Sequence, residues 1–409
     1  MQPKIRFNNF FSNWYKSKLD EHVSFFSGLT YSPDDVQEKE DGVLVLRSSN
    51  IQNNNIVYDD NVYVNKDVVN TSYVRSGDII LVVRNGSKRL IGKHALIHSY
   101  MKDTVIGAFM TGIRAKNYYF INALLDSYSF QKQIYKNLGA TINQITNRDL
   151  HNMCFFFPDS LDEQKKVGYF FSILDQIIEQ ANQQLKQYQS LKKGLLQKLF
   201  PCKDDYYPKV RFYGFNNAWN EIVLKDIVDI ERGLTYKPSD QTNKDGVMVV
   251  RSSNIERNKF VFNKNDVFVK KDIISIPFLN AGDIVITAAN GSVQLVGKHT
   301  MIKQMENIKL VHGGFMLKIC SNYGHFINQW MSTSSYNRQI KKMIQGGMGA
   351  LGNISSNSLK KLKVKIPSEN EQIKIVNLLE KLDRLIELQE KKVNKLKALK
   401  QGLLQRMFC

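Results

Sequence analysis

The sequence predicts a mixed α/β protein with two tandem globular domains, each followed by one long helix. Three observations predict this fold class: the chain repeats itself collinearly, the first part of each repeat holds short β-branched runs separated by turn residues, and the last part keeps an uninterrupted helical period. A chain of 409 residues with 43% hydrophobic residues is long enough for two domains with separate cores.

The two halves of the chain carry the same peptides in the same order. GLTYSPDDVQEKEDGVLVLRSSNI begins at Gly28, and GLTYKPSDQTNKDGVMVVRSSNI begins at Gly233. SGDIILVVRNGSKRLIGKH begins at Ser76 and matches AGDIVITAANGSVQLVGKH at Ala281. PKIRF matches PKVRF near the two starts, and KGLLQKLF matches QGLLQRMF near the two ends. The period of about 205 residues is domain-sized, far longer than the roughly 20–50 residues of solenoid repeats.

The globular parts are predicted at 1–161 and 200–369. They contain the β-branched runs VLVLRS, DIILVV, VMVVRS and DIVITAA, punctuated by Asp-Gly, Asn-Gly and Ser-Gly pairs that signal turns. Polar helical stretches such as YFINALLDSYSFQKQIYKNL also occur. We expect mixed α/β globules, each with a curved and mainly β core.

The long helices are predicted at 162–199 and 370–409. The first segment has no proline and only two glycines, and a proline followed by Glu-Gln precedes or opens both segments. A helix of 38 residues spans about 57 Å, and a narrow apolar stripe of that length needs a partner. We therefore expect the two helices to pack as an antiparallel coiled coil with one globule near each end. The alternative is a pair of long packing helices inside one compact domain.

The charge balance favours a polyanionic partner. The chain has 57 Lys and Arg against 38 Asp and Glu, a net charge of +19. The first globule carries only +3, whereas the second carries +10. Nucleic acid is the first candidate partner, and an anionic membrane surface is the second.

Composition also predicts the compartment. No run of about 18 apolar residues is present, and the first residues lack the apolar core of a signal peptide, so we expect a cytoplasmic protein that does not enter a membrane. The cysteines form no CxxC pair, so neither a disulfide framework nor a metal site is expected. They are Cys154, Cys202, Cys320 and Cys409.

The duplicated Asn-Gly-Ser and Gly-Lys-His segments are the first candidate DNA-binding residues. Glycines permit a tight loop, while Asn, Ser and Lys offer donors to phosphates or base edges. The alternative is a plain β-hairpin turn, for which Asn-Gly is a strong signal. Between the repeats the flanking residues diverge, as expected of a common frame that reads different sequences. The candidates are Arg84, Asn85, Ser87, Lys88, Arg89, Lys93 and His94 in the first repeat, and Asn290, Ser292, Gln294, Lys298 and His299 in the second, where Ala289 and Val293 replace basic residues.

The duplicated RSSN stretches supply the remaining candidates. Arg47 or Arg251 has the chemistry to contact a phosphate or guanine, and Asn50 or Asn254 has the chemistry to contact an adenine edge. The alternative is a strand end at which Ser-Ser-Asn caps the backbone. For the serines we favour capping, and for the arginines both interpretations stay open.

Catalytic machinery is not evident in the sequence. Pro158-Asp159 followed by Glu163-x-Lys165 resembles the carboxylate motif of nucleases. However, the spacing between the acidic residues is too short, and the second repeat has Ile373 in place of the lysine. Neither a P-loop nor a Rossmann glycine fingerprint is present. The pattern indicates a binding scaffold without its own catalysis.

The order of these motifs resembles the specificity subunit of type I restriction–modification enzymes. The resemblance covers essentially all 409 residues, and it depends on the duplicated GDI…NGS…GKH stretches and the helices that run from Glu-Gln to GLLQ. It implies two target recognition domains, each reading one half of an asymmetric bipartite site in double-stranded DNA, and helices that fix the gap between the halves.

The same resemblance implies partners and cofactors. Two modification subunits would hold S-adenosylmethionine and methylate adenine, and restriction subunits would use ATP and Mg²⁺, so that no cofactor belongs to this chain. Two other classes remain open: a basic non-catalytic scaffold for nucleic acid or a membrane surface outside restriction–modification, and a self-sufficient methyltransferase or nuclease. The helix residues expected to bind the partners are Leu174, Leu185, Leu195, Leu382, Leu396 and Leu403.

Overall fold

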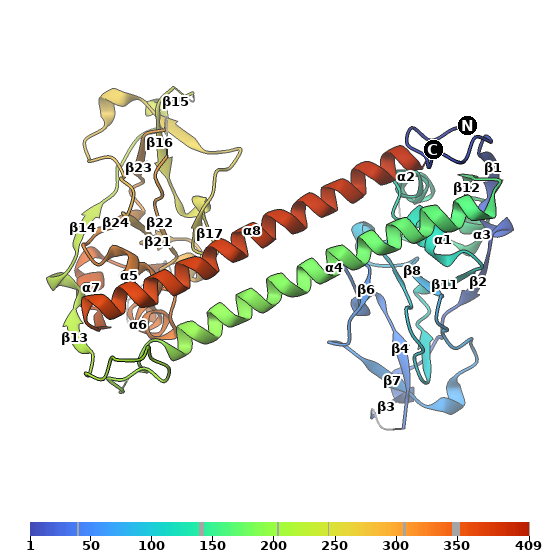
Figure 1. Ribbon diagram of the computed structural model, residues 1–409, viewed down its shortest axis with the longest axis horizontal. Coiled ribbons are helices and arrows are strands. Elements are labelled where there is room, and N and C mark those ends of the chain that lie inside the picture. Colours follow the sequence, from blue (N-terminus) through green and yellow to red (C-terminus); the bar gives the residue numbers. More distant parts are fainter. Residues whose placement is uncertain are drawn as a thin grey trace. The chain divides into compact units, whose positions relative to one another are not determined.

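The periodic segment at the end of each repeat forms one long helix. The computed structural model describes residues 1–38, 41–138, 143–202, 204–243, 245–305, 308–345 and 352–408. In it, helix α4 spans Leu161–Lys198 and helix α8 spans Glu369–Met407 (Figure 1). The predicted helix bounds therefore differ from these by one or two residues.

The chain forms two compact units, and each helix contributes to both. Unit 1 comprises Met1–Gln183 and Glu390–Cys409, and unit 2 comprises Gln184–Gln389. Each unit thus holds one globule, the first half of the helix that follows it, and the last half of the other helix. The predicted boundaries at 161 and 369 separate globule from helix, but the units do not divide there.

Unit 1 is built on two four-stranded sheets. One has the order β2-β11-β8-β9 and is antiparallel, whereas the other has the order β10-β4-β7-β3 and includes the parallel pair β10 and β4. All residues of β4 and β8 are buried, which explains why VLVL and IILV are continuous apolar runs rather than alternating ones. The elements of unit 1 are β1 (Tyr15–Lys18), β2 (Val23–Ser27), β3 (Val36–Gln37), β4 (Val43–Leu46), β5 (Ile51–Gln52), β6 (Asn55–Ile56), β7 (Val62–Val64), β8 (Ile79–Val82), β9 (His94–Leu96), β10 (Thr104–Ile106), β11 (Met110–Ala115), α1 (Tyr118–Leu125), α2 (Tyr128–Asn137), α3 (Asn147–Asn152) and β12 (Cys154–Phe157).

Unit 2 repeats the two four-stranded sheets of unit 1 and adds one short strand pair, β21 with β25, where the described residues of unit 1 have only the isolated bridge of Arg84 with Gln144. Its sheets have the orders β14-β24-β20-β22 and β15-β19-β16-β23, and β16 pairs with β23 in parallel. The mixed α/β class and the duplication of the fold are therefore confirmed. The elements of unit 2 are β13 (Asn220–Val223), β14 (Asp229–Arg232), β15 (Gln241–Thr242), β16 (Val247–Val250), β17 (Ile255–Glu256), β18 (Lys259–Phe260), β19 (Val267–Val269), β20 (Ile284–Thr287), β21 (Ala289–Asn290), β22 (His299–Met301), β23 (Leu310–His312), β24 (Met316–Cys320), α5 (Gly324–Trp330), α6 (Ser334–Gln345), β25 (Gly352–Asn353), α7 (Ser356–Lys360) and β26 (Lys363–Ile366).

The GLTY peptides hold two backbone segments in close contact. A Cβ added at Gly28 would lie 2.0 Å from the carbonyl oxygen of Gly107, and one added at Gly233 would lie 1.9 Å from that of Gly313. The Leu29 amide donates to the carbonyl of Ile106 at 2.7 Å. Only glycine fits such an approach, so this duplicated motif is a packing requirement.

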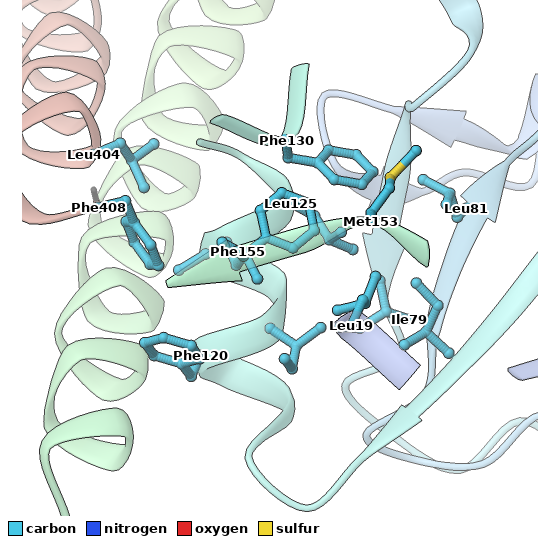
Figure 2. Packing of buried hydrophobic residues seen from close by; sticks show 14 of the residues in the cluster. Leu19, Ile79, Leu81, Phe120, Leu125, Phe130, Met153, Phe155, Leu404 and Phe408 are labelled. Carbon is cyan, nitrogen blue, oxygen red and sulfur yellow. The ribbon is translucent and has the colours of Figure 1, made fainter. Parts of the chain in front are cut away.

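The core of unit 1 includes the end of α8. Leu404, Met407 and Phe408 belong to the same buried cluster as the residues of α1 and the first half of α4. Figure 2 shows Leu404 and Phe408 beside Phe120 and Phe155, and the ring centroids of Phe120 and Phe408 are 5.5 Å apart. In unit 2 the end of the other helix is buried in the same way, through Leu199 and Phe200. The GLLQ segments are thus core-forming.

A buried ion pair connects PKIRF and PKVRF to the Glu-Gln helix starts. Arg6 donates to both carboxylate oxygens of Glu163 at 2.6 and 2.7 Å, and Trp14 Nε1 donates to Glu163 at 3.2 Å. Arg211 binds Glu371 in the same bidentate way, with both distances at 2.8 Å. This arrangement excludes Glu163 as part of a nuclease motif, because its carboxylate is committed to an arginine.

A second pair of ion contacts joins the helices inside each unit. In unit 1 the Lys400 ammonium of α8 lies 2.5 Å from Asp175 of α4, and in unit 2 the Lys192 ammonium of α4 lies 2.6 Å from Asp383 of α8. These pairs occupy equivalent positions of the two repeats. Burial alone would lower the pKa of Lys400, but the attraction of Asp126 and Asp175 outweighs burial and the pKa is raised.

We predict that Phe408→Ala destabilises unit 1, because it removes an almost fully buried ring from the core. The expected loss is about 3–5 kcal/mol in free energy of unfolding. Hydrogen exchange should show faster exchange in α1 and in the first half of α4, with unit 2 unaffected. Phe11→Ala is the matched control, since Phe11 is largely exposed. Equal protection of unit 1 in wild type and Phe408→Ala would contradict the assignment of this ring to the core.

Candidate nucleic-acid interface

The two duplicated polar motifs of each unit are hydrogen-bonded to each other. The Asn85 side-chain amide donates to the hydroxyl of Ser48 at 3.0 Å, and Asn290 donates to Ser252 at 2.9 Å. Each asparagine also accepts from the backbone amide two residues later, which closes the Asn-Gly-Ser turn. The RSSN and NGS peptides therefore form one local structure, and this explains why both are present twice.

The RSSN stretches form strand ends, as the capping interpretation predicts. Ser48–Asn50 and Ser252–Asn254 are single 3-10 turns after β4 and β16. The side-chain Oδ1 of Asn50 accepts from the Arg47 backbone amide at 2.9 Å, and the side-chain NH₂ group donates to the carbonyl of Val57 at 3.1 Å. Asn254 makes the equivalent bonds and is equally buried.

The prediction that Asn50 and Asn254 contact DNA is therefore corrected. Both side chains are fully buried, and their amides bind neighbouring loop residues rather than presenting donors to a base edge. The sequence could not distinguish this role, because an asparagine that holds a loop and one that reads an adenine have the same local signal.

The histidines of the two GKH segments are also core residues. His94 and His299 are each 2% exposed, and the ring Nε2 of His299 lies 3.2 Å from the backbone carbonyl oxygen of Asn328. Burial lowers the pKa of His299 to about 4, against the opposing effect of its backbone hydrogen bonds, so the ring is neutral at pH 7. Neither histidine reaches DNA from this position, and the prediction of DNA contact for them is corrected.

His94 instead connects the loop between β8 and β9 to the helices of unit 1. Its Nε2 lies 3.4 Å from Asp126, whose other carboxylate oxygen lies 2.6 Å from the Lys400 ammonium. Asn54, at a left-handed position of the β5–β6 hairpin, donates to Asp126 at 2.6 Å. This polar chain fixes the base of the loop between β8 and β9 against the end of α8.

The loop between β8 and β9 is longer than a two-residue hairpin. Leu81 pairs with His94 across the two antiparallel strands, so residues 83–93 form the connection. The Asn-Gly pair is therefore not the hairpin turn itself. Gly92 and Gly297 are the glycines that the loop requires, because both have a φ near +86°, at +87° and +85°.

The loop presents exposed side chains that differ between the units. The structure leaves six of the predicted residues exposed and six half-buried. The exposed ones are Arg84, Ser87, Lys88, Arg89, Ser292 and Gln294, and the half-buried ones are Arg47, Asn85, Lys93, Arg251, Asn290 and Lys298.

The two RSSN arginines are held by their own loops. The Arg47 guanidinium lies 2.8 Å from the Asp60 carboxylate, and that of Arg251 donates to the carbonyl of Asn265 at 2.8 Å. Burial lowers the pKa of Lys93 from its ordinary value. These three side chains are half-buried, whereas Lys88 and Arg89 are exposed on a 3-10 turn, Lys88–Leu90.

Each loop has an exposed aromatic residue beside it that the sequence did not predict as a site residue. Phe109 and Phe315 occupy equivalent positions after β10 and β23, and the Arg84 guanidinium lies 4.9 Å from the centroid of the Phe109 ring. The pair GAFM and GGFM at these positions was the available signal, but a phenylalanine between two strands is ordinarily assigned to the core.

The predicted helix residues do not form an exposed docking face. Leu174 and Leu382 are buried, and Leu185, Leu195, Leu396 and Leu403 are half-buried. Leu195, Leu396 and Leu403 pack against the cores of their own units. The exposed apolar residues of the helices are others, among them Ile177, Leu191, Leu385, Leu388 and Leu399.

The model for the type I restriction modification DNA specificity domain matches this chain twice, at residues 11–187 and 216–398. The chain belongs to this family. Each match spans one globule and most of its helix, and together they confirm the resemblance seen in the duplicated motifs.

Known members of the specificity family are similar along most of their length. The chain is 22% identical over 401 residues to the type I restriction enzyme EcoKI specificity subunit of Escherichia coli (strain K12), covering 93% of this chain and 84% of that one. It is 23% identical over 416 residues to the type I restriction enzyme StySPI specificity subunit of Salmonella potsdam, covering 97% and 88%. The crystal structure of the S subunit of the type I restriction–modification system from M. genitalium matches with a TM-score of 0.65 at 16% identity, covering 100% of this chain and 99% of that one.

Neither a membrane span nor a metal cluster is found in the described part of the specificity chain. There, no helix has the length and apolarity to cross a bilayer, and no group of three or more His, Cys, Asp or Glu side chains is arranged to hold a metal ion.

The buried histidine of unit 2 predicts a pH dependence. The unfolded state takes up a proton near the ordinary His pKa of about 6.5, whereas His299 in the fold resists protonation until about pH 4. Its contribution to stability is therefore complete above pH 6.5 and is lost as pH falls toward 4, by up to about 3 kcal/mol. Denaturant unfolding at pH 7.5 and pH 5 should show a smaller loss in His299→Gln than in wild type. His312, whose pKa is also lowered by burial, supplies a residual loss. The same loss in both proteins would exclude His299 as its source.

Proposed function

We propose that this chain is the DNA-specificity subunit of a type I restriction–modification complex, in which each unit reads one half of a bipartite DNA site. One observation carries the proposal. The NGS loop is attached to the RSSN turn by the same hydrogen bond in both units, but the exposed tips differ. A frame that stays constant while its tips change is what the reading of two different sequences requires. The differing residues are Arg84, Lys88 and Arg89 in unit 1, all exposed, and the half-buried Ala289 with the exposed Val293 and Gln294 in unit 2.

The charge distribution supports a DNA ligand. The net charge of +19 provides the counterion-release term that supplies much of the affinity for duplex DNA. Phosphate contacts position a protein and base contacts specify the sequence, so the frame and its exposed tips divide the two tasks. Family membership favours this function over a scaffold for a membrane surface.

The two long helices are proposed to form an antiparallel coiled coil that fixes the gap between the half-sites. The ion pair of Asp175 with Lys400 in unit 1 and that of Asp383 with Lys192 in unit 2 support this arrangement. In each pair one partner comes from the first half of a helix and the other from the last half of the other helix. Oppositely directed neighbours have this pattern. Two DNA readers need a fixed separation, because base pairs in register recur about every 34–36 Å along the duplex.

Exposed apolar residues of the helices are proposed to dock two modification subunits. Ile177 and Leu385 occupy equivalent positions in the two repeats, and so do Leu191 and Leu399. The least exposed of these four side chains is Ile177, at 41%. Unit 1 therefore presents Ile177 and Leu399, and unit 2 presents Leu385 and Leu191. Two equal apolar pairs suit two copies of one partner. They replace the leucines expected from the sequence.

Catalysis is proposed to belong to the partner subunits. The modification subunits would hold S-adenosylmethionine and methylate adenine, and restriction subunits would use ATP and Mg²⁺. This chain would bring the DNA to them in the cytoplasm. The buried carboxylates Glu163 and Glu371 are bound by arginines, which supports a structural rather than a catalytic role for them.

We predict a methylation motif with two unlike halves and a fixed gap. The chain is co-expressed with its modification subunit, and methylated adenines are mapped by single-molecule sequencing of genomic DNA. In the triple variant Arg84→Ala, Lys88→Val, Arg89→Gln, one half of the motif should lose specificity, because a lost base contact costs about 1–3 kcal/mol. The other half should not change. Lys186→Ala, on the exposed surface of α4, is the control. Two identical inverted halves, or equal loss in both halves, would contradict the proposal.

We predict that Leu399→Lys weakens the binding of one modification subunit and that Leu191→Lys weakens the binding of the other. Burying a charge in place of a leucine forfeits about 1.5–3 kcal/mol, or roughly ten- to hundredfold in affinity. Native mass spectrometry should show one bound modification subunit for each single variant and none for the double variant. Gln184→Lys, an exposed polar position of α4, should retain both. Full occupancy in the double variant would place the docking surface elsewhere.

A further inference from the structure

Each unit exposes one phenylalanine at the tip of a tight turn. Phe109 is 54% exposed and Phe315 is 75% exposed. Turn tips ordinarily carry small polar residues, and an exposed phenyl ring gives up part of the hydrophobic stabilisation that burial would provide. The same costly residue stands at the same position in both repeats, although the neighbouring loop tips differ.

The turn of unit 1 is held rigidly by backbone hydrogen bonds. The Met110 amide donates to the carbonyl of Gly107 at 2.8 Å, which closes the turn around Ala108 and Phe109. The Phe109 carbonyl accepts from the amides of Val83 and Arg84 at 3.1 and 3.2 Å. The backbone that carries the ring is therefore fixed beside the start of the loop between β8 and β9.

The turn of unit 2 has the same three hydrogen bonds. The Met316 amide donates to Gly313 at 2.8 Å, and the Phe315 carbonyl accepts from Ala288 and Ala289 at 2.9 and 3.1 Å. Both units thus retain the whole turn, including its exposed ring. We expect the ring to have the same role in both units.

The turn also joins the other duplicated motifs. In unit 1 the Gly107 amide donates to the carbonyl of Leu46, immediately before Arg47, at 2.9 Å, and Gly28 packs on the carbonyl of Gly107. The GLTY, RSSN and NGS peptides thus converge on the segment that presents Phe109. The frame places this ring beside Arg84 at the start of the loop between β8 and β9.

The environment of the ring differs between units in one respect. The Arg84 guanidinium lies 4.9 Å from the Phe109 centroid, within the range of a cation–π contact, whereas Ala289 stands at the position of Arg84 in unit 2. Phe315 is correspondingly the more exposed of the two rings. The side chain that varies is the cation, and the one that stays is the aromatic ring.

We propose that Phe109 and Phe315 stack on a base of the DNA, one ring in each half-site. Every base has a π-face, so stacking tolerates any sequence, and one aromatic residue can serve two readers with different targets. Proteins that insert apolar side chains into duplex DNA use rings such as this to wedge a base step. The proposal rests on the proposed function, since it requires that each unit bind one half-site.

The test couples a ring to a base. Duplexes carrying the methylation motif are made with a single abasic substitution at each position in turn, and their affinities are measured for the complex of the full chain with its modification subunits. Phe109→Leu should weaken binding of the intact duplex about ten- to hundredfold, since stacking on an aromatic side chain contributes about 1–3 kcal/mol per base. At one position of the half-site read by unit 1, the abasic duplex should show no further loss from Phe109→Leu. Phe315→Leu should show the same coupling in the other half-site.

The controls separate stacking from other causes. Phe109→Tyr keeps the aromatic face and should bind within about threefold of wild type, and Phe11→Leu removes an exposed ring elsewhere in unit 1 and should have no effect. Losses that add at every position would overturn the stacking proposal while the specific binding of the wild type upholds the proposed function. A wild-type complex that does not prefer the motif to a scrambled duplex would overturn both.

Discussion

The rest of the structure depends on one constraint: the C-terminal end of each long helix is buried in the core of the other repeat's globule. The unit 1 cluster includes Leu404 and Met407 from the last turn of α8 and Phe408 directly after it, and the unit 2 cluster includes Leu199 and Phe200 directly after α4. Neither repeat therefore completes its core from its own globule. The Lys400 and Lys192 ion pairs lie in the same two places, so electrostatics and packing fix the same alignment of the helices.

Most of the duplicated peptides maintain this construction. Gly28 permits a close backbone approach, Arg6 and Glu163 form a buried ion pair, and His94 joins the chain of polar contacts that ends at Lys400. Such residues are the same in both repeats because both cores need them. The exposed loop tips have no core to satisfy and are free to differ, which is the physical basis of the two specificities that we propose for one frame.

The sequence predicted the architecture well because the signals were long. Helical periodicity over almost forty residues and collinear duplication over about 205 residues survive any local ambiguity. Single polar residues were harder. Asn50 and His94 have the chemistry of DNA ligands, and only the burial of their side chains shows that they serve the fold. The exposure of Phe109 could not be predicted for the opposite reason, since a phenylalanine between two strands is normally buried. Leu174 and Leu382 likewise fit either a packing stripe or a docking face, and the structure buries them.

We propose that the two long helices set the distance between the two DNA-reading units. Inserting one heptad in α4 after Gln183 and one in α8 after Gln389 leaves the ion pairs and the buried ends in place. Each insertion adds about 10 Å of helix, or roughly three base pairs of DNA. Adenine methylation mapped on genomic DNA should then show the same two half-sites separated by a gap about three base pairs longer. An unchanged gap in a complex that still methylates would contradict the account, because the helices would then not determine the spacing.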